Sequence, residues 1–100
     1  MELIDTIFEG LSCQEEQTRA VIRMALADIS LFDSKQHDYG PSNISKFGET
    51  GVLVRISDKV ERLINLNKAG IPEHESIDDT WQDLSIYGII ARVVRNRDWL

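Results

Sequence analysis

The strongest constraint on this chain of 100 residues is the helical spacing of its apolar residues between a few breakpoints. Glycine and proline gather at Gly10, Gly40-Pro41, Gly48 to Gly51 and Gly70 to Pro72. The segments between them are long enough for helices and do not alternate apolar and polar residues as strands do. The pattern therefore predicts an all-α fold in a single domain that covers residues 1–100.

The first long helix is predicted from after Ser12 to about Lys35, because Ser12 and Glu15 have the spacing of a capping box. Two neighbouring apolar stripes on this helix are together wider than one core contact needs. We therefore expect the helix to be central, or to pack also against a second subunit. Asp28 falls within one stripe, so its carboxylate either reaches water at the edge or is paired or metal-bound.

The rest of the chain is expected to form a short helical turn and two more long helices. The turn opens at Pro41-Ser42, the next helix covers about 51–66, and the last begins near Ser76 or Ile77 and runs to about Arg95. β-branched residues at the start of segment 51–66 leave a strand as the alternative there. The sum is a helical bundle of three long helices and one or two short ones, expected to be oligomeric.

The balance of charges narrows the range of partners. The chain has 17 acidic and 11 basic residues, a net charge of −6, which argues against a general nucleic-acid binder. The negative charge still allows a small phosphate-bearing ligand, because metal ions can neutralise both the protein carboxylates and the ligand phosphates. The single cysteine, Cys13, favours a reducing compartment. No apolar run approaches the roughly 20 residues that span a bilayer, so we expect a cytoplasmic protein with no membrane partner.

Acidic residues are concentrated near the start of the last helix. Five of the 17 lie in the 11 residues from Glu73 to Asp83. Glu75, Asp79 and Asp83 are spaced i, i+4, i+8, while Glu75 and Asp78 form a Glu-x-x-Asp pair. Crowded carboxylates favour a bound cation, and all-oxygen ligands suit Mg²⁺. The alternative is that these acids are simply favoured in the first turn of a helix.

The predicted helix at about 51–66 contains both acidic and basic residues that could belong to the same site. Asp58 would complete a metal cage with Glu75 and Asp79. Lys59 and Arg62 would then hold phosphate oxygens. Metal, cations and a positioned water are what phosphoryl transfer to water requires. The alternative is that Asp58 and Arg62 form a surface ion pair that contributes little.

The segment 35–40 combines a cation, an imidazole, a carboxylate and an aromatic ring before a glycine. Tyr39 could stack on a base, and Lys35 could contact a phosphate. The alternative is a helix C-terminus with Gly40 as its stop and Tyr39 packed on the core.

Many short sequence elements occur in one order between residues 35 and 87. They are Lys35, Asp38-Tyr39-Gly40, Asn43, Phe47-Gly48, Gly51, Arg55, Asp58-Lys59, Arg62, Glu75-Ser76, Asp79-Thr80, Asp83-Leu84 and Tyr87. From about Lys35 to Ala91 the chain thereby resembles a small branch of the MazG-like, all-α nucleoside triphosphate pyrophosphohydrolases. That branch is linked to phage and bacterial nucleotide modification.

The resemblance implies hydrolysis of a (deoxy)nucleoside triphosphate to monophosphate and pyrophosphate. The cofactor would be Mg²⁺, with Mn²⁺ as the alternative ion. The superfamily has a Glu-x-x-Glu pair on one helix and a Glu-x-x-Asp pair on the next, and both pairs hold the metal. Here these would be Asp58 with Glu61 and Glu75 with Asp78, so Asp replaces the first Glu.

In the smaller branch the second set of ligands falls one residue later, at Asp79 and Asp83, and both registers stay open. The metal-ligand candidates are therefore Asp58, Glu61, Glu75, Asp78, Asp79 and Asp83, of which Glu75 and Asp79 are also the catalytic candidates. Contacts to phosphate, base or sugar are assigned to Lys35, Tyr39, Asn43, Lys59 and Arg62. The resemblance also implies a homodimer or homotetramer with sites near subunit interfaces. The rival hypotheses are a non-catalytic nucleotide-binding module and a plain helical interaction protein.

Overall fold

The computed structural model describes residues 2–68 and 74–100, with side chains throughout except at residues 74–76. These residues form five α-helices and no strand. In chain order they are α1 (Leu3–Gly10), α2 (Gln17–Tyr39), α3 (Ser42–Ser45), α4 (Gly48–Lys68) and α5 (His74–Arg95). The predicted all-α bundle of three long helices and one or two short ones is confirmed, with two short helices among the described residues.

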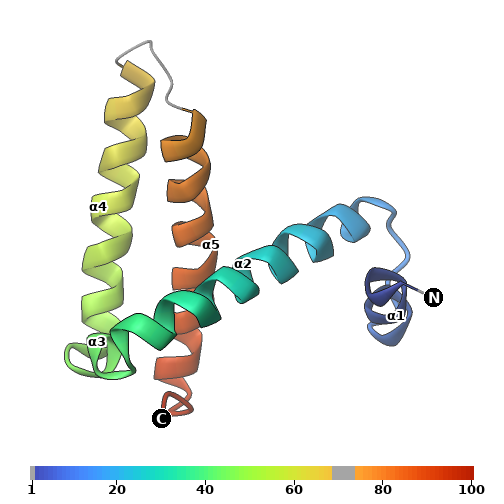
Figure 1. The fold of residues 1–100 in the computed structure, drawn as a ribbon, viewed down its shortest axis with the longest axis horizontal. Helices are drawn as coiled ribbons and strands as arrows, with labels where there is room; N and C mark the ends of the chain where they lie inside the picture. Colours follow the sequence, from blue (N-terminus) through green and yellow to red (C-terminus); the bar gives the residue numbers. More distant parts are fainter. Residues whose placement is uncertain (1, 69–73) are drawn as a thin grey trace.

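Two helices form the centre of the molecule and a third crosses them. The helices α4 and α5 lie side by side and run in opposite directions, with the C-terminal half of α2 packed across α5 (Figure 1). The N-terminal half of α2 extends away from this pair and carries α1 at its far end (Figure 1). The chain is therefore open rather than spherical, with extents of 40 × 39 × 23 Å.

The main core lies where α3, α4 and α5 meet. Its buried residues are Ile44, Val52 and Ile90. Partly buried hydrophobic residues pack against them: Phe32, Ile56, Ile86, Tyr87, Ala91, Val94 and Trp99. Val52 with Ile56, and Ile86 with Ile90, are each four residues apart, so each pair shares one helix face as the sequence pattern predicts.

The C-terminal end of the chain folds back onto this core. The helix α5 ends in a Schellman turn with Arg97 at a φ of 62°. This turn leads to Trp99, whose ring lies edge-on to Phe32 with 6.0 Å between centroids. The indole Nε1 of Trp99 donates a hydrogen bond to the carbonyl oxygen of Pro41 at 2.9 Å. The contact ties the chain end to the base of α2 and α3.

The start of α2 corrects the sequence prediction. This helix begins at Gln17, and the capping box predicted for Ser12 and Glu15 is wrong. Ser12 instead ends α1, with a φ of 57° and with its own N–H and that of the next residue bonded to carbonyl oxygens of α1. Polar residues serve both as helix starts and as helix ends, and the preceding short helix decides between the two.

The short helix α1 is held on α2 by one arginine. The guanidinium of Arg19 lies 4.0 Å from the ring centroid of Phe8. It also forms ion pairs with Asp5 of α1 and with Glu16. Phe8 and Ile22 are buried in α1 and α2 respectively. This second, smaller contact is separate from the main core.

The helices α4 and α5 extend beyond their predicted bounds, and α2 extends past its predicted end at Lys35 to Tyr39. Residues 48–68 are helical throughout, so the strand alternative at the start of segment 51–66 is wrong. Gly40 ends α2 with a φ of 75°, as predicted, but Tyr39 is 66% exposed and does not pack on the core. Among the described residues, no helix is long and apolar enough to cross a membrane.

The core assignment gives a stability prediction. Replacing Ile90 by Ala should lower the free energy of unfolding by about 2–5 kcal/mol, because it removes buried methyl groups and leaves a cavity. Ile89→Ala is the matched control, since Ile89 is exposed on the same helix, and it should change stability by less than about 0.5 kcal/mol. Urea unfolding followed by circular dichroism measures both. Equal losses in the two variants would contradict the assignment.

Candidate functional site

A cavity of about 420 Å³ opens where the C-terminal half of α2 meets α3, α4 and α5. Its lining combines apolar, aromatic, amide and charged side chains. They are Asp28, Leu31, Phe32, Lys35, Gln36, Tyr39, Asn43, Ile44, Arg55, Lys59, Gln82, Asp83, Ile86, Tyr87 and Ile90. Apolar walls with a few convergent polar groups are typical of a small-molecule site.

Three charged side chains from three helices meet in this cavity. Asp83 of α5 binds Lys35 of α2, with 3.2 Å between Oδ1 and Nζ, and Lys59 of α4, with 3.0 Å between Oδ2 and Nζ. Asp83 is only 21% exposed, while Lys59 and Lys35 are 31% and 46% exposed. We call this group the Lys35–Asp83–Lys59 cluster. Both oxygens of the carboxylate are engaged by ammonium groups.

A third cation lies one helical turn from Lys59. Arg55 is four residues before Lys59 on α4, so both side chains lie on the cavity face. Its Nη2 donates to the carbonyl oxygen of Asn43 at 2.9 Å. The Nε2 of Gln36 donates to Oδ1 of the same asparagine at 3.4 Å. Asn43 is thus held between α2 and α4. The guanidinium of Arg55 has further N–H groups that could donate hydrogen bonds to a ligand.

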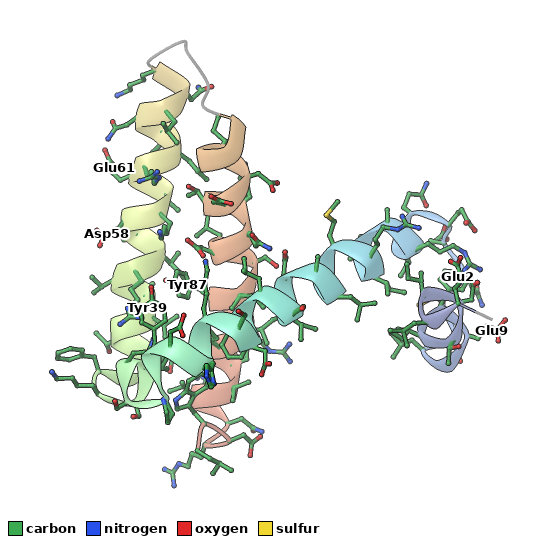
Figure 2. All side chains as sticks on the ribbon, in the orientation of Figure 1. Glu2, Glu9, Tyr39, Asp58, Glu61 and Tyr87 are labelled. Atoms are coloured by element: carbon green, nitrogen blue, oxygen red, sulfur yellow. The ribbon has the colours of Figure 1, made fainter. Side chains whose placement is uncertain are left out.

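Two tyrosines belong to the same cavity. Tyr39 of α2 and Tyr87 of α5 both line it where the end of α2 meets the α4–α5 pair (Figure 2). Tyr87 is half-buried against the core, whereas Tyr39 stays exposed. An aromatic face beside cationic groups is suited to a ligand that carries both a flat ring and anionic oxygens.

The predicted ligands on α4 lie elsewhere. Asp58, Glu61 and Arg62 are exposed and line a shallow depression with Asn65 and Leu66, made of α4 residues only. In Figure 2, Asp58 and Glu61 project from the side of α4 that is turned away from α5. The structure therefore does not bring these residues into the cavity with Lys59.

The predicted metal ligands that precede Asp83 on α5 do not line the cavity. Asp78 and Asp79 are exposed, and Asp79 lies one turn before Asp83. The backbone of Glu75 belongs to the first turn of α5, but its side chain lies outside the described residues. Among the side chains that are described, no group of three or more His, Cys, Asp and Glu residues could hold a metal ion. Those carboxylates alone do not form the expected cage.

The structure thus brings together part of the predicted site. Lys35, Tyr39, Asn43, Lys59 and Asp83 share one cavity. Sequence reasoning did not assign a role in the site to several other residues that line the cavity: Asp28, Gln36, Arg55, Gln82 and Tyr87. Their spacing was informative, because two of them lie four residues from Lys59 or Asp83 on the same helix face.

Comparisons of the chain with protein-family models, with curated proteins and with solved structures gave no match. The geometry and chemistry of the cavity indicate which ligands it can bind. Cationic, aromatic and amide groups converge there in a chain whose net charge is −6.

The link between Arg55 and Asn43 gives a second stability prediction. Arg55→Met should lower the free energy of unfolding by about 1–3 kcal/mol, because it removes a half-buried hydrogen bond from a charged donor and leaves a carbonyl oxygen without that donor. Arg92→Met, at an exposed site on α5, should change it by less than about 0.5 kcal/mol. Thermal unfolding of the two variants compares the effects, and a neutral Arg55→Met would contradict the role of this bond.

Proposed function

We propose that the cavity binds a (deoxy)nucleoside triphosphate, which the protein hydrolyses with Mg²⁺ to a monophosphate and pyrophosphate. The observation that supports the binding step is the convergence of Lys35, Lys59 and Arg55 in one cavity. Ammonium and guanidinium groups are the usual partners of phosphate oxygens, and Arg can engage two of them at once. A cytoplasmic protein would meet such nucleotides routinely.

The remaining lining supports a nucleotide rather than a free phosphate. The cavity volume of about 420 Å³ is in the range of small-molecule sites. Tyr39 and Tyr87 offer aromatic faces for a base. The amides of Asn43, Gln36 and Gln82 offer donors and acceptors for a base edge or a sugar hydroxyl. Phosphate, base and sugar contacts are thus all available within one cavity.

The hydrolytic step is proposed from the resemblance to the MazG-like enzymes. Bound Mg²⁺ would neutralise charge on the phosphates. Asp79 is one turn from the cavity on α5, and Glu75 is one turn further on, so these two carboxylates are the first candidates to hold the ion and orient the attacking water. Lys59 and Lys35 would hold the phosphate chain during the reaction.

The proposal predicts release of pyrophosphate. The protein should be incubated with each common NTP and dNTP plus Mg²⁺, and pyrophosphate and monophosphate should be assayed. We expect release from at least one nucleotide, and we expect Asp79→Asn to abolish it. Lys59→Met should weaken nucleotide binding at least about ten-fold, equal to ~1.4 kcal/mol.

The control for Lys59→Met is Lys46→Met, which removes an exposed lysine outside the cavity and should leave binding unchanged. If no nucleotide releases pyrophosphate, the hydrolytic proposal is wrong.

A non-catalytic nucleotide-binding module is the second candidate. It is favoured by one specific observation, which is that the described carboxylates do not assemble a metal cage. It predicts that nucleotides raise the melting temperature without being cleaved, because a ligand bound only to the folded state stabilises it. A plain helical interaction protein predicts no shift with Mg²⁺ or with any nucleotide.

We also propose that the chain forms a homodimer or homotetramer. Its accessible surface is 7699 Å², whereas a compact monomer of 11.4 kDa exposes about 5,800 Å². The difference of roughly 1,900 Å² exceeds the ~800 Å² that each partner buries in a standard interface. The radius of gyration of 15.6 Å likewise exceeds the ~13 Å of a compact domain this long. Val21 and Met24 are exposed on the projecting half of α2, and Ile29 is exposed near its middle.

The oligomer proposal has a direct test. Light scattering on a sizing column should give a multiple of 11.4 kDa for the native protein. The double variant Val21→Glu with Met24→Glu should shift the mass to that of one chain, because it places two charges on the apolar part of α2. Ser34→Glu, at an exposed polar position of the same helix, should leave the mass unchanged. A native mass of 11.4 kDa would exclude the proposal.

A further inference from the structure

The two lysines assigned to phosphate are already occupied by an anion of the protein itself. Lys35 and Lys59 come from different helices, and each places its Nζ within 3.2 Å of a different oxygen of Asp83. A carboxylate that holds two ammonium groups uses the same charge-assisted contacts that a phosphate group would use. In the structure, the Asp83 carboxylate therefore occupies both ammonium groups.

We propose that Asp83 is an internal competitor for this phosphate site, so that a ligand binds by taking Lys35 and Lys59 from it. This inference rests on the proposed binding of a nucleotide in the same cavity. It assigns to Asp83 a role in setting ligand affinity, in place of the metal-binding role predicted for it from the acidic spacing.

The geometry places the Asp83 carboxylate next to any phosphate bound by both lysines. A phosphate that contacts both ammonium groups must come within a few ångströms of the Asp83 carboxylate, because both groups already touch it. The carboxylate is only 21% exposed, so water screens the repulsion between the two anions less than it would at the surface. The ligand must therefore displace the carboxylate or bind more weakly in its presence.

The lysine side chains are suited to such an exchange. Each ends in three rotatable donors on a flexible four-carbon stem, and neither is fully buried. Arg55 differs, because it is anchored to the carbonyl oxygen of Asn43 rather than to a carboxylate. The fixed guanidinium would give a ligand its first contact, and the two lysines would follow.

Two other roles for Asp83 predict different results. If Asp83 positions the lysines for the ligand, removing its charge should weaken binding. If it only fastens α2 and α4 to α5, removing its charge should lower stability and leave affinity unchanged. The sign of the change in affinity therefore separates the three roles.

The test is calorimetric titration of inorganic pyrophosphate into the metal-free protein at low ionic strength. We expect Asp83→Asn to bind pyrophosphate at least about ten-fold more tightly than the native protein, because the amide keeps the shape of the side chain and loses its charge. The gain should disappear when Lys35→Met and Lys59→Met are combined with Asp83→Asn. Asp33→Asn is the control for net charge, since Asp33 is exposed on α2 outside the cavity, and it should leave affinity unchanged.

Unchanged or weaker binding by Asp83→Asn overturns the inference, and so does an equal gain in Asp33→Asn. If Asp83→Asn does not fold, the native protein can be tested instead by NMR. The carboxyl ¹³C resonance of Asp83 must then shift on saturation with pyrophosphate. An unmoved resonance also overturns the inference. Hydrolysis of a nucleotide without any effect of Asp83→Asn on pyrophosphate binding would sink this inference alone. Tighter pyrophosphate binding by the variant without hydrolysis would sink only the hydrolytic proposal.

Discussion

Asp83 is the residue through which three helices of this small protein are joined electrostatically. Its carboxylate receives one ammonium group from α2 and one from α4. Partly exposed ion pairs add little to stability, about 0–1 kcal/mol each, so burial of Ile44, Val52 and Ile90 has to provide most of what holds α3, α4 and α5 together. The Lys35–Asp83–Lys59 cluster therefore contributes little to the stability of the fold. Its main effect is to set the positions of the charged groups in the cavity.

The two halves of α2 have different surroundings. The C-terminal half lies on α5 and contributes Lys35 and Tyr39 to the cavity. The N-terminal half contacts α1 and leaves Val21 and Met24 exposed. A chain of this length buries a modest share of its surface even when it is compact. An open arrangement buries less, so any ligand or second subunit bound to the folded state would add a large fraction of the total stability.

The spacing of residues in the sequence predicted where the helices lie and which residues share a helix face. It did not predict which side chains of different helices contact each other. Apolar residues four apart predicted the long helices, because side chains at that spacing share a face. Spacing on α5 also grouped Asp83 with Asp79 as candidate metal ligands. It could not reveal that Asp83 meets Lys35 and Lys59, which lie 48 and 24 residues away in the chain. For the same reason Asp58 was predicted beside Glu75, although it lies on the outer side of α4.

The charge of the cavity and the charge of the whole chain point to the same class of ligand. Within the described part of the chain, three cationic and two acidic side chains line the cavity, whereas the protein as a whole carries −6. A net charge of −6 disfavours the approach of an extended polyanion such as nucleic acid. A small ligand can place all of its negative charge inside the cavity. Under the proposed function, the local excess of positive charge would favour compact phosphates, and Asp83 would offset part of that excess until such a ligand displaced it.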